Sequence, residues 1–155
     1  MTFHEWIEAH SPHGDVLDVG CGSHLHGRWG IDMERVADVV ADATAIPVRH
    51  GALDGVVCAQ VLPYTESDPI AILREIHRVL RPGGILLLTA QRWSWSPLRW
   101  DRLLVVMDFE VASVLPPRRM WSYRGWIARR GNLPIGRDWD DVEHCHRWVP
   151  TAPAA

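Results

Sequence analysis

The sequence predicts an α/β fold with a mostly parallel sheet and helices on its faces. One observation is that short apolar runs, each ending in a glycine or a carboxylate, alternate with turn residues in the first half of the chain. A second is that a strand, a helix and a strand follow one another with short joints between residues 55 and 90. Such a βαβ unit makes neighbouring strands parallel. The 155 residues, 47% hydrophobic and 23% charged, suit one globular domain.

The first half of the chain is expected to hold one short helix and four strands. Thr2 and Glu5 have the spacing of a capping box, so residues 1–13 are predicted to be an N-terminal helical segment. The run at 55–62 is apolar throughout, which is typical of a strand buried on both faces. The predicted strands are residues 16–19, 30–32, 39–42 and 55–62.

The second half begins with the clearest helix. Asp68 is a candidate N-cap, Pro69 suits the first helical position, and apolar residues recur at helical spacing until Pro82-Gly83-Gly84. The elements predicted after it are a strand at 85–90, a helix at 97–107 and strands at 109–114 and 122–129. The domain is expected to span residues 14–131, followed by an irregular C-terminal tail at 132–155.

Composition excludes several classes of function. All 16 basic residues are arginine, so a P-loop lysine and a Schiff-base lysine are both absent. A net charge of -3 argues against nucleic-acid binding as the main function. The apolar runs are shorter than the roughly 20 residues of a membrane span, and the first ten residues do not resemble a signal peptide. With three scattered cysteines, the protein is expected to be cytoplasmic, without membrane contact.

A glycine turn and two carboxylates predict a ligand site at the carboxyl ends of the first three strands. Gly20-Cys21-Gly22 lets the backbone approach a ligand closely and offers N–H groups at a helix start. The dinucleotide fingerprint requires a third glycine where Leu25 stands, so NAD is disfavoured. Asp32 follows Gly20 by 12 residues, where about 20 is ordinary, so the intervening helix must be reduced to about one turn. Asp42 is then placed to accept a hydrogen bond from an adenine amino group.

Four segments together resemble the class I S-adenosylmethionine-dependent methyltransferases. They are Val16 to Gly22, Ala41 to Pro47, Leu53 to Val57 and Arg74 to Gly84. The likeness covers residues 14–90 and is similar to the type 11 methyltransferase domain, in a subgroup with a short first helix. It implies a Rossmann-like, doubly wound sheet of seven strands, mostly parallel with a final antiparallel strand, in a compact single domain. It also implies S-adenosylmethionine as the cofactor.

The resemblance carries a set of cofactor residues onto this chain. Asp18, Gly20 and Gly22 would surround the methionine moiety, Asp32 would hold the ribose, and Asp42 with Ala43 would contact adenine. The full expected set is Asp18, Gly20, Cys21, Gly22, Asp32, Met33, Asp42, Ala43, Gln60 and Val61. His24 stands where the family has its third glycine, so its side chain is expected to crowd the methionine end.

Candidates for a general base are Tyr64, His24 and His26. Methyl transfer from a sulfonium is an in-line displacement that needs little beyond alignment, so a base is required only for an acceptor such as a hydroxyl. The alternative is that Tyr64 is a packed aromatic and both histidines are loop residues. His24 and His26 with residues 144–146 also suit zinc by residue type, but no metal is expected because nothing brings the two segments together.

The segment from Pro116 to Arg137 interleaves arginines with Trp121, Tyr123 and Trp126. Arginine and indole together suit a phosphate-bearing or saccharide acceptor. The alternative is a solvated edge strand whose arginines prevent aggregation.

The sequence therefore predicts a methyltransferase that passes a methyl group to a hydroxyl or other nucleophile of a saccharide or specialised metabolite. The expected partner is a small-molecule, saccharide or carrier-bound acceptor and not a nucleic acid, with a homodimer formed through the Trp-rich C-terminal region. Two alternatives stay open: a non-catalytic cofactor-binding or partner module, and a cofactor-dependent enzyme that does not methylate.

Overall fold

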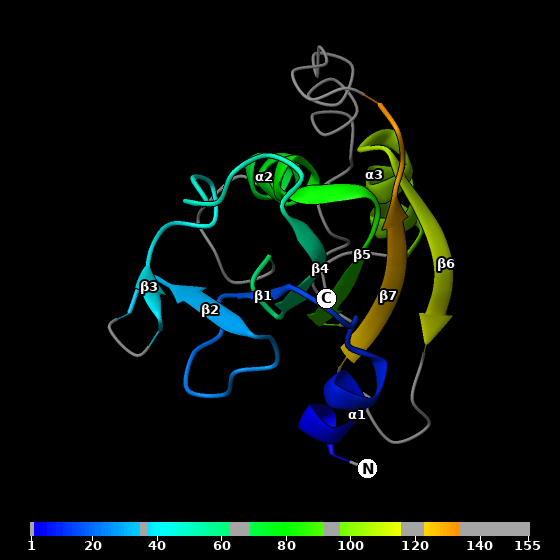
Figure 1. Ribbon diagram of the computed structural model, residues 1–155. Coiled ribbons are helices and arrows are strands. Elements are labelled where there is room, and N and C mark those ends of the chain that lie inside the picture. Colours follow the sequence, from blue (N-terminus) through cyan, green and yellow to red (C-terminus); the bar gives the residue numbers. More distant parts are fainter. Residues whose placement is uncertain (1, 35–36, 63–68, 92–96, 116–122, 134–155) are drawn as a thin grey trace.

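Seven strands form one sheet in the computed structural model, which describes residues 2–34, 37–62, 69–91, 97–115 and 123–133 (Figure 1). In chain order the elements are α1 (Phe3–His10), β1 (Val16–Val19), β2 (Trp29–Asp32), β3 (Val39–Val40), β4 (Leu53–Ala59), α2 (Pro69–Val79), β5 (Leu80–Gln91), α3 (Pro97–Val106), β6 (Phe109–Leu115) and β7 (Tyr123–Arg130).

The strands follow the order β3-β2-β1-β4-β5-β7-β6 across the sheet. Strands β1 to β5 pair in parallel, whereas β7 runs antiparallel to both of its neighbours, β5 and β6. The predicted fold class is therefore confirmed, including the final antiparallel strand.

The two faces of the sheet are covered differently. Successive residues of β4 alternate between two cores, because side chains of a strand point to opposite faces. Val56 and Cys58 join a large core with α2 and α3, whereas Val57 joins a smaller one with Trp6 and Ile7 of α1. Figure 1 shows α2 and α3 near one another at the top and α1 alone at the bottom.

Helix α1 starts with the predicted capping box. Thr2 Oγ1 accepts from the Glu5 amide at 3.3 Å, and Glu5 Oε2 accepts from the Thr2 amide at 2.6 Å. Trp6 lies on β7 at Gly125, where a Cβ would stand 2.0 Å from the indole, so only glycine fits there. Gly125 pairs with Thr89 near the end of β5. The helix therefore packs at the carboxyl ends of the parallel strands.

No helix connects β1 to β2, in agreement with the early position of Asp32. Residues 20–28 are all described, and they fold back over β1 as an irregular loop. The Arg28 amide donates to the Val16 carbonyl at 2.8 Å, and a Cβ at Gly27 would lie 2.8 Å from the same oxygen. This loop occupies the place of the first helix of a doubly wound sheet.

Several strand boundaries differ from those predicted, most of them by one or two residues. β3 ends at Val40 because Asp42 begins a turn, and β4 ends at Ala59 because Gln60 has a left-handed φ of 61°. β5 begins at Leu80, before the Pro-Gly-Gly sequence that was expected to precede it. Leu80 pairs with Leu53 of β4, a long-range contact that local patterns do not reveal.

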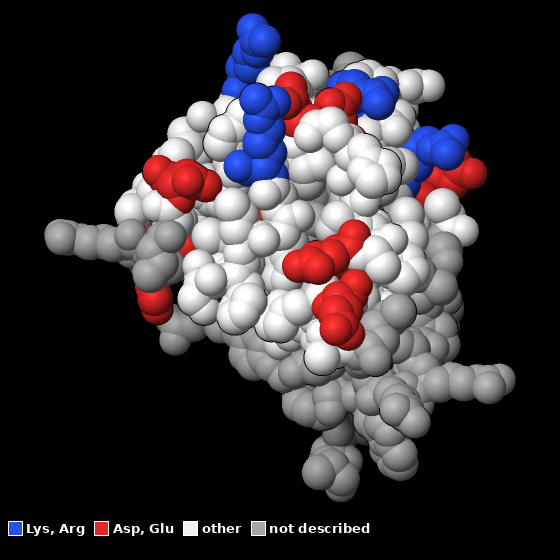
Figure 2. Space-filling model, turned by 60° about the horizontal axis from the view of Figure 1, so that its bottom comes forward, with Lys and Arg blue, Asp and Glu red and all other residues white. Residues whose placement is uncertain are grey.

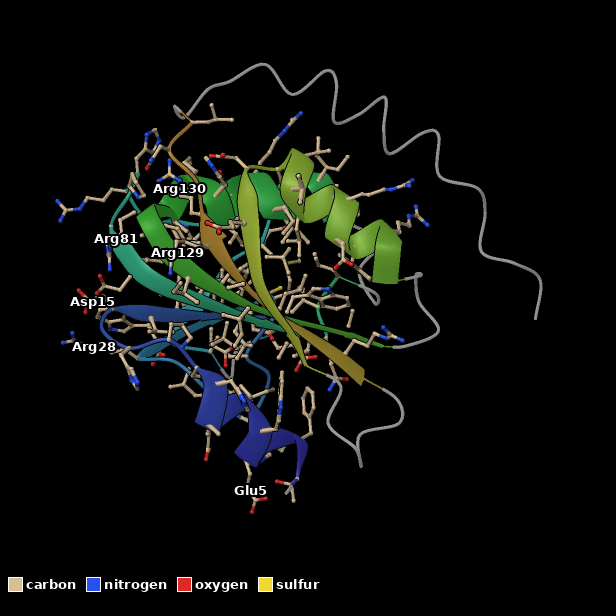
Figure 3. The ribbon with its side chains drawn as sticks, turned by 90° about the vertical axis from the view of Figure 1, so that its right-hand side faces the viewer. Glu5, Asp15, Arg28, Arg81, Arg129 and Arg130 are labelled. Carbon is tan, nitrogen blue, oxygen red and sulfur yellow. The ribbon has the colours of Figure 1, made fainter. Side chains whose placement is uncertain are left out.

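Ion pairs tie together the amino-terminal ends of the central strands. Arg81 donates to Asp54 Oδ1 at 2.7 Å, the other oxygen of Asp54 accepts from the Asp15 amide at 2.8 Å, and Arg28 donates to Asp15 Oδ1 at 2.6 Å. Figure 3 shows Arg81, Asp15 and Arg28 along one side of the molecule, apart from Glu5 on α1.

Candidate functional site

A cavity of about 320 Å³ lies at the carboxyl ends of β1 to β4. Its wall consists of Gly20, Ile31, Asp32, Met33, Ala41, Asp42, Ala43, Gln60, Val61 and Ile72. Most of the cofactor residues expected from the sequence are among them. Ile31, Ala41 and Ile72 were not expected; the first two precede the expected carboxylates, whereas no sequence signal marks Ile72 of α2.

The glycine turn meets two different requirements. Gly20 has a φ of +70°, and a Cβ on it would lie only 2.3 Å from Cγ2 of Val61 in the wall of the cavity. Gly22 has a φ of +53°, but nothing lies within 4 Å of a Cβ placed there. Glycine is favoured at both positions by conformation, and at Gly20 also by space.

Asp32 fastens the turn to the end of β2. One of its carboxylate oxygens accepts from the Gly22 amide at 2.9 Å and the other from the Glu34 amide at 3.0 Å. Each carboxylate oxygen has two lone pairs, so Asp32 keeps acceptor capacity toward the cavity.

Asp42 lies in the cavity wall and also stabilises the turn that follows β3. Its Oδ1 accepts from both the amide and the hydroxyl of Thr44, each at 2.8 Å. These bonds lower the pKa of Asp42 below its ordinary value, so the side chain is a carboxylate at neutral pH. The cavity therefore has two carboxylates, Asp32 and Asp42, in its wall.

Gln60 and Val61 close the wall after β4. Gln60 adopts a left-handed conformation, which is uncommon for a residue other than glycine. Its amide donates to the Thr89 carbonyl at 3.2 Å, which holds the turn against β5. Non-glycine residues in this region often mark functional sites.

Asp18 and Cys21 have surroundings other than those expected. The Asp18 carboxylate is buried and accepts from the amide of His26 at 2.8 Å and from its Nδ1 at 3.2 Å, so it faces the loop beside the cavity. Cys21 packs against Gly30, where a Cβ would lie 2.6 Å from its sulfur. Burial, with Asp18 and Asp32 nearby, raises the pKa of the Cys21 thiol.

The structure describes two of the three candidate bases, His24 and His26. Tyr64 lies outside the described residues, so its role stays a prediction. His24 is exposed and its ring stacks on His4 at 4.2 Å between centroids, an arrangement that directs it to α1 instead of the cavity. His26 bonds to Asp18 and, through Nε2, to Nδ1 of His4 at 2.9 Å. His4 was not expected at the site.

No group of three or more His, Cys, Asp or Glu residues among the described positions has the arrangement of a metal site. Residues 144–146 lie outside the described part of the chain. Cys58 is fully buried in β4, where burial raises the pKa of its thiol.

The interpretation of the Arg- and Trp-rich segment is wrong for Trp126 and Arg130, whereas it stays a prediction for the exposed Arg129 and the half-buried Arg124. Trp126 is 1% exposed and its indole donates to Asp101 at 2.7 Å, so it belongs to the core. Arg130 is also buried, between His77 and the Leu80 carbonyl. The edge-strand alternative fails as well, because β7 lies between β5 and β6. Residues 116–122 and 134–137 are outside the described residues.

The strand order, the antiparallel β7 and a cavity at the ends of β1 to β4 define a class I methyltransferase fold. The comparisons agree with this. A family model described as a methyltransferase domain matches residues 31–88. The chain therefore has the fold of the class I S-adenosylmethionine-dependent methyltransferases, and its central part matches a methyltransferase domain, as the sequence motifs indicated.

Two kinds of curated relative match the chain. A ubiquinone biosynthesis O-methyltransferase from Pseudomonas paraeruginosa is 29% identical over 139 residues, which cover 72% of this chain and 57% of the relative. The tRNA (carboxymethyluridine(34)-5-O)-methyltransferase ALKBH8 from Macaca fascicularis is 31% identical over 106 residues, which cover 54% of this chain and 16% of the relative. The chain therefore spans about half of the first relative and a small part of the second.

Solved structures share the fold at low sequence identity. A Haloferax volcanii protein in complex with the Trm112 methyltransferase activator has a TM-score of 0.71 and 18% identity, covering 84% of this chain and 90% of its own. The [4+2]-cyclase SpnF has a TM-score of 0.67 and 18% identity, covering 83% of this chain and 79% of its own.

S-adenosylmethionine, the cofactor of this class, fits the residues of the cavity. Its ribose hydroxyls and amino groups are donors, and Asp32 and Asp42 supply carboxylate acceptors. The open space at Gly22 leaves room for a ligand against the backbone. A dinucleotide fits less well, because residues 20–28 contain no helix whose N-terminus would bind a diphosphate. The expected N–H groups at a helix start are thus not present in this loop.

Proposed function

We propose that this protein transfers a methyl group from S-adenosylmethionine to an oxygen nucleophile of a small molecule. The observation that carries the proposal is the cavity at the ends of β1 to β4, with Asp32 and Asp42 in its wall, in a chain that matches a methyltransferase domain. In this arrangement Asp32 with Met33 binds the ribose, Asp42 with Ala43 binds the adenine, and the turn from Gly20 to Gly22 approaches the methionine moiety.

The bound cofactor supplies an activated methyl group on a positively charged sulfur. The chain's own residues provide alignment and a dry wall: the apolar side chains of Ile31, Val61 and Ile72 line the cavity. Alignment of the two reactants accounts for much of the acceleration of such a displacement. Asp32 stiffens the wall by holding the glycine turn to β2.

The acceptor is proposed to react through oxygen because both curated relatives carry an O-methyltransferase name. We favour a hydroxyl of a saccharide, a specialised metabolite or a carrier-bound precursor over tRNA. Figure 2 supports this choice, because tRNA binding requires a continuous basic surface. On the face drawn there, the described residues include scattered acidic side chains, and the basic side chains gather toward one end.

Isothermal titration calorimetry with S-adenosylmethionine, S-adenosylhomocysteine and NAD tests the cofactor site. We expect micromolar binding of the first two and none of NAD. Asp32→Asn keeps an acceptor for the Gly22 amide but removes the charge, and Asp42→Ala removes the adenine contact. Each should weaken binding about 10- to 100-fold, the loss expected for a charge-assisted hydrogen bond. Glu110→Ala, an exposed change on β6, is the control.

The same titration separates the competing proposals. Cofactor binding without methyl transfer to any hydroxyl acceptor would favour an enzyme that uses the cofactor for a different reaction. The [4+2]-cyclase SpnF, which shares the fold, is the structural neighbour that motivates this alternative. No binding at all would favour a partner module, and a module needing an activator has a precedent in the structural neighbour bound to Trm112.

Oligomeric state and location complete the proposal. A homodimer in the cytoplasm is the expected form, and light scattering after gel filtration measures its mass directly. Trp121, Trp139 and Trp148 of the proposed Trp-rich C-terminal interface lie outside the described residues, and Trp126 is buried in the core. None of the helices in the described part of the chain has the length and hydropathy of a membrane span.

A further inference from the structure

Three histidines and one aspartate from three separate segments meet outside the cavity wall, where the loop between β1 and β2 contacts α1. His26 of the loop bonds through Nδ1 to Oδ2 of Asp18 at 3.2 Å and through Nε2 to Nδ1 of His4 at 2.9 Å. The His24 ring stacks on His4 with 17° between the planes. The Asp18 and His26 side chains are only 1% and 6% exposed. The series Asp18–His26–His4 thus runs from a buried carboxylate to the accessible helix α1.

The direction of these hydrogen bonds follows from the chemistry of the groups. A carboxylate only accepts, so Nδ1 of His26 carries the proton and donates it to Asp18. A neutral imidazole has one donor and one acceptor nitrogen, so Nε2 of His26 accepts from Nδ1–H of His4. Nε2 of His4 is then an unprotonated nitrogen, with no hydrogen-bond partner in the described part of the chain. The series ends in a base.

The base lies at the same end of the sheet as the cavity. Asp18 lies at the end of β1, two residues ahead of Gly20 of the cavity wall. Helix α1, which carries His4, packs at the carboxyl ends of the parallel strands through Trp6 on Gly125 (Figure 1). His4, His26 and Asp18 are not part of the cavity wall, so an acceptor meets His4 if it extends from the cavity to α1.

We propose that Nε2 of His4 is the general base that takes the proton from the acceptor hydroxyl, with His26 and Asp18 as positioning residues. This rests on the proposed function. The O–H bond of the acceptor breaks and its proton goes to Nε2 of His4, while an oxygen electron pair forms the bond to the methyl carbon. The pair of the broken carbon–sulfur bond stays on sulfur, and His4 later releases the proton to water.

The surroundings of His4 suit this role. Burial, followed by the rings of His24 and His26, lowers the pKa of His4 below its ordinary value of 6.5, against an opposing effect of Glu8. The imidazole is then unprotonated at neutral pH. His26 cannot be the direct base because both of its nitrogens already have partners. The sequence candidate His26 is thereby given a supporting role.

The first test needs neither cofactor nor acceptor. Two-bond ¹H–¹⁵N correlation spectra distinguish the tautomers of each histidine, and we expect neutral His4 with its proton on Nδ1. In His26→Phe, which keeps a ring but removes both bonds, His4 should return to the Nε2–H form that free imidazole prefers. A native His4 with its proton on Nε2, or an His26 imidazolium at neutral pH, would overturn the proposal.

The second test measures the reaction with S-adenosylmethionine and a panel of phenols and sugars as hydroxyl acceptors. His4→Gln should lower kcat about 10²- to 10⁴-fold, the usual contribution of a general base, and leave cofactor affinity within twofold. His13→Gln, on an exposed loop residue, is the control and should be unchanged. The wild-type rate should fall at acid pH as His4 becomes protonated, with His24, His26 and Glu8 as the neighbouring titratable groups.

The outcomes separate the two proposals. Cofactor binding with an unchanged rate in His4→Gln overturns the base and leaves the methyltransferase. Cofactor binding without transfer to any hydroxyl overturns the proposed oxygen acceptor and the base together. Absence of cofactor binding overturns the proposed function, whereas the tautomer spectra still decide whether the hydrogen-bonded series exists.

Discussion

Replacing Gly20 and Gly22 separately by alanine tests whether the glycine turn is shaped by conformation alone or also by space. Both residues have left-handed φ angles, +70° and +53°. For alanine this conformation costs about 1–2 kcal/mol at either position. Only at Gly20 would the new methyl group collide, since it would lie 2.3 Å from Cγ2 of Val61, whereas at Gly22 nothing lies within 4 Å.

The expected magnitudes therefore differ. Gly22→Ala should lower the free energy of unfolding by about 1–2 kcal/mol. Gly20→Ala adds overpacking of about 1–3 kcal/mol, so its total loss is about 2–5 kcal/mol. For a chain of this size each kcal/mol lowers Tm by roughly 2–4 °C. Because Val61 lines the cavity, Gly20→Ala should also weaken S-adenosylmethionine binding more than Gly22→Ala does.

Urea unfolding and calorimetric titration measure both effects. The double variant Gly20→Ala with Val61→Ala removes the colliding methyl, so it should be more stable than the sum of the two single changes predicts. Equal losses for the two glycine variants, or strict additivity in the double variant, would refute the steric argument and leave only backbone conformation.

Three further predictions concern the rest of the fold. Burial alone would raise the pKa of Glu75, but hydrogen bonds from Arg78 and a backbone amide outweigh it and lower the pKa below 4.5. Because folding lowers the pKa of Glu75, its ionised form stabilises the native state at pH values above its pKa in the unfolded chain. This stabilisation is lost as the pH falls through the pKa in the folded protein. Acid unfolding curves of Glu75→Gln should therefore be less steep than those of the wild type. Trp126→Phe should cost about 2–4 kcal/mol by urea unfolding, because it empties core volume and leaves an aspartate of α3 without its indole partner. Cys21 and Cys58 are buried with raised pKa values, so mass-mapped alkylation by iodoacetamide should modify them only on unfolding. Rapid labelling of either in the native state would contradict their placement.

The sheet could be predicted because its signals are local. The apolar runs of β1 and β4, the capped helix α1 and the periodic helix α2 each occupy a few consecutive residues. The early Asp32 also predicted correctly that no full helix separates β1 from β2. The start of β5 could not be predicted, because it depends on Leu80 pairing with Leu53 across the sheet.

Most residues of the cavity wall could be predicted from the sequence because of the geometry of a parallel sheet. The carboxyl ends of parallel strands meet at one edge of a sheet, so Asp32 at the end of β2 and Asp42 just beyond β3 are expected in the wall of one cavity. Trp126 and Arg130 were misinterpreted because a strand's own residues do not tell whether it is central, and β7 proves to be enclosed by β5 and β6. His4 had no signal, since its contact with His26 depends on where α1 packs.

The missing first helix explains why Asp18 does not face the cavity. A helix satisfies most of its own amide groups, whereas the N–H groups of the loop at 20–28 need acceptors elsewhere. The Gly20 and Cys21 amides donate to the Ile31 carbonyl at 2.8 and 3.2 Å. The amides of Gly22 and His26 donate to the carboxylates of Asp32 and Asp18. Asp18 is thus used to hold the loop, and by holding the loop at His26 it also sets the ring that orients His4. The compression of the chain between β1 and β2 therefore accounts for both the bond that fastens the glycine turn to Asp32 and the bond that orients the proposed base.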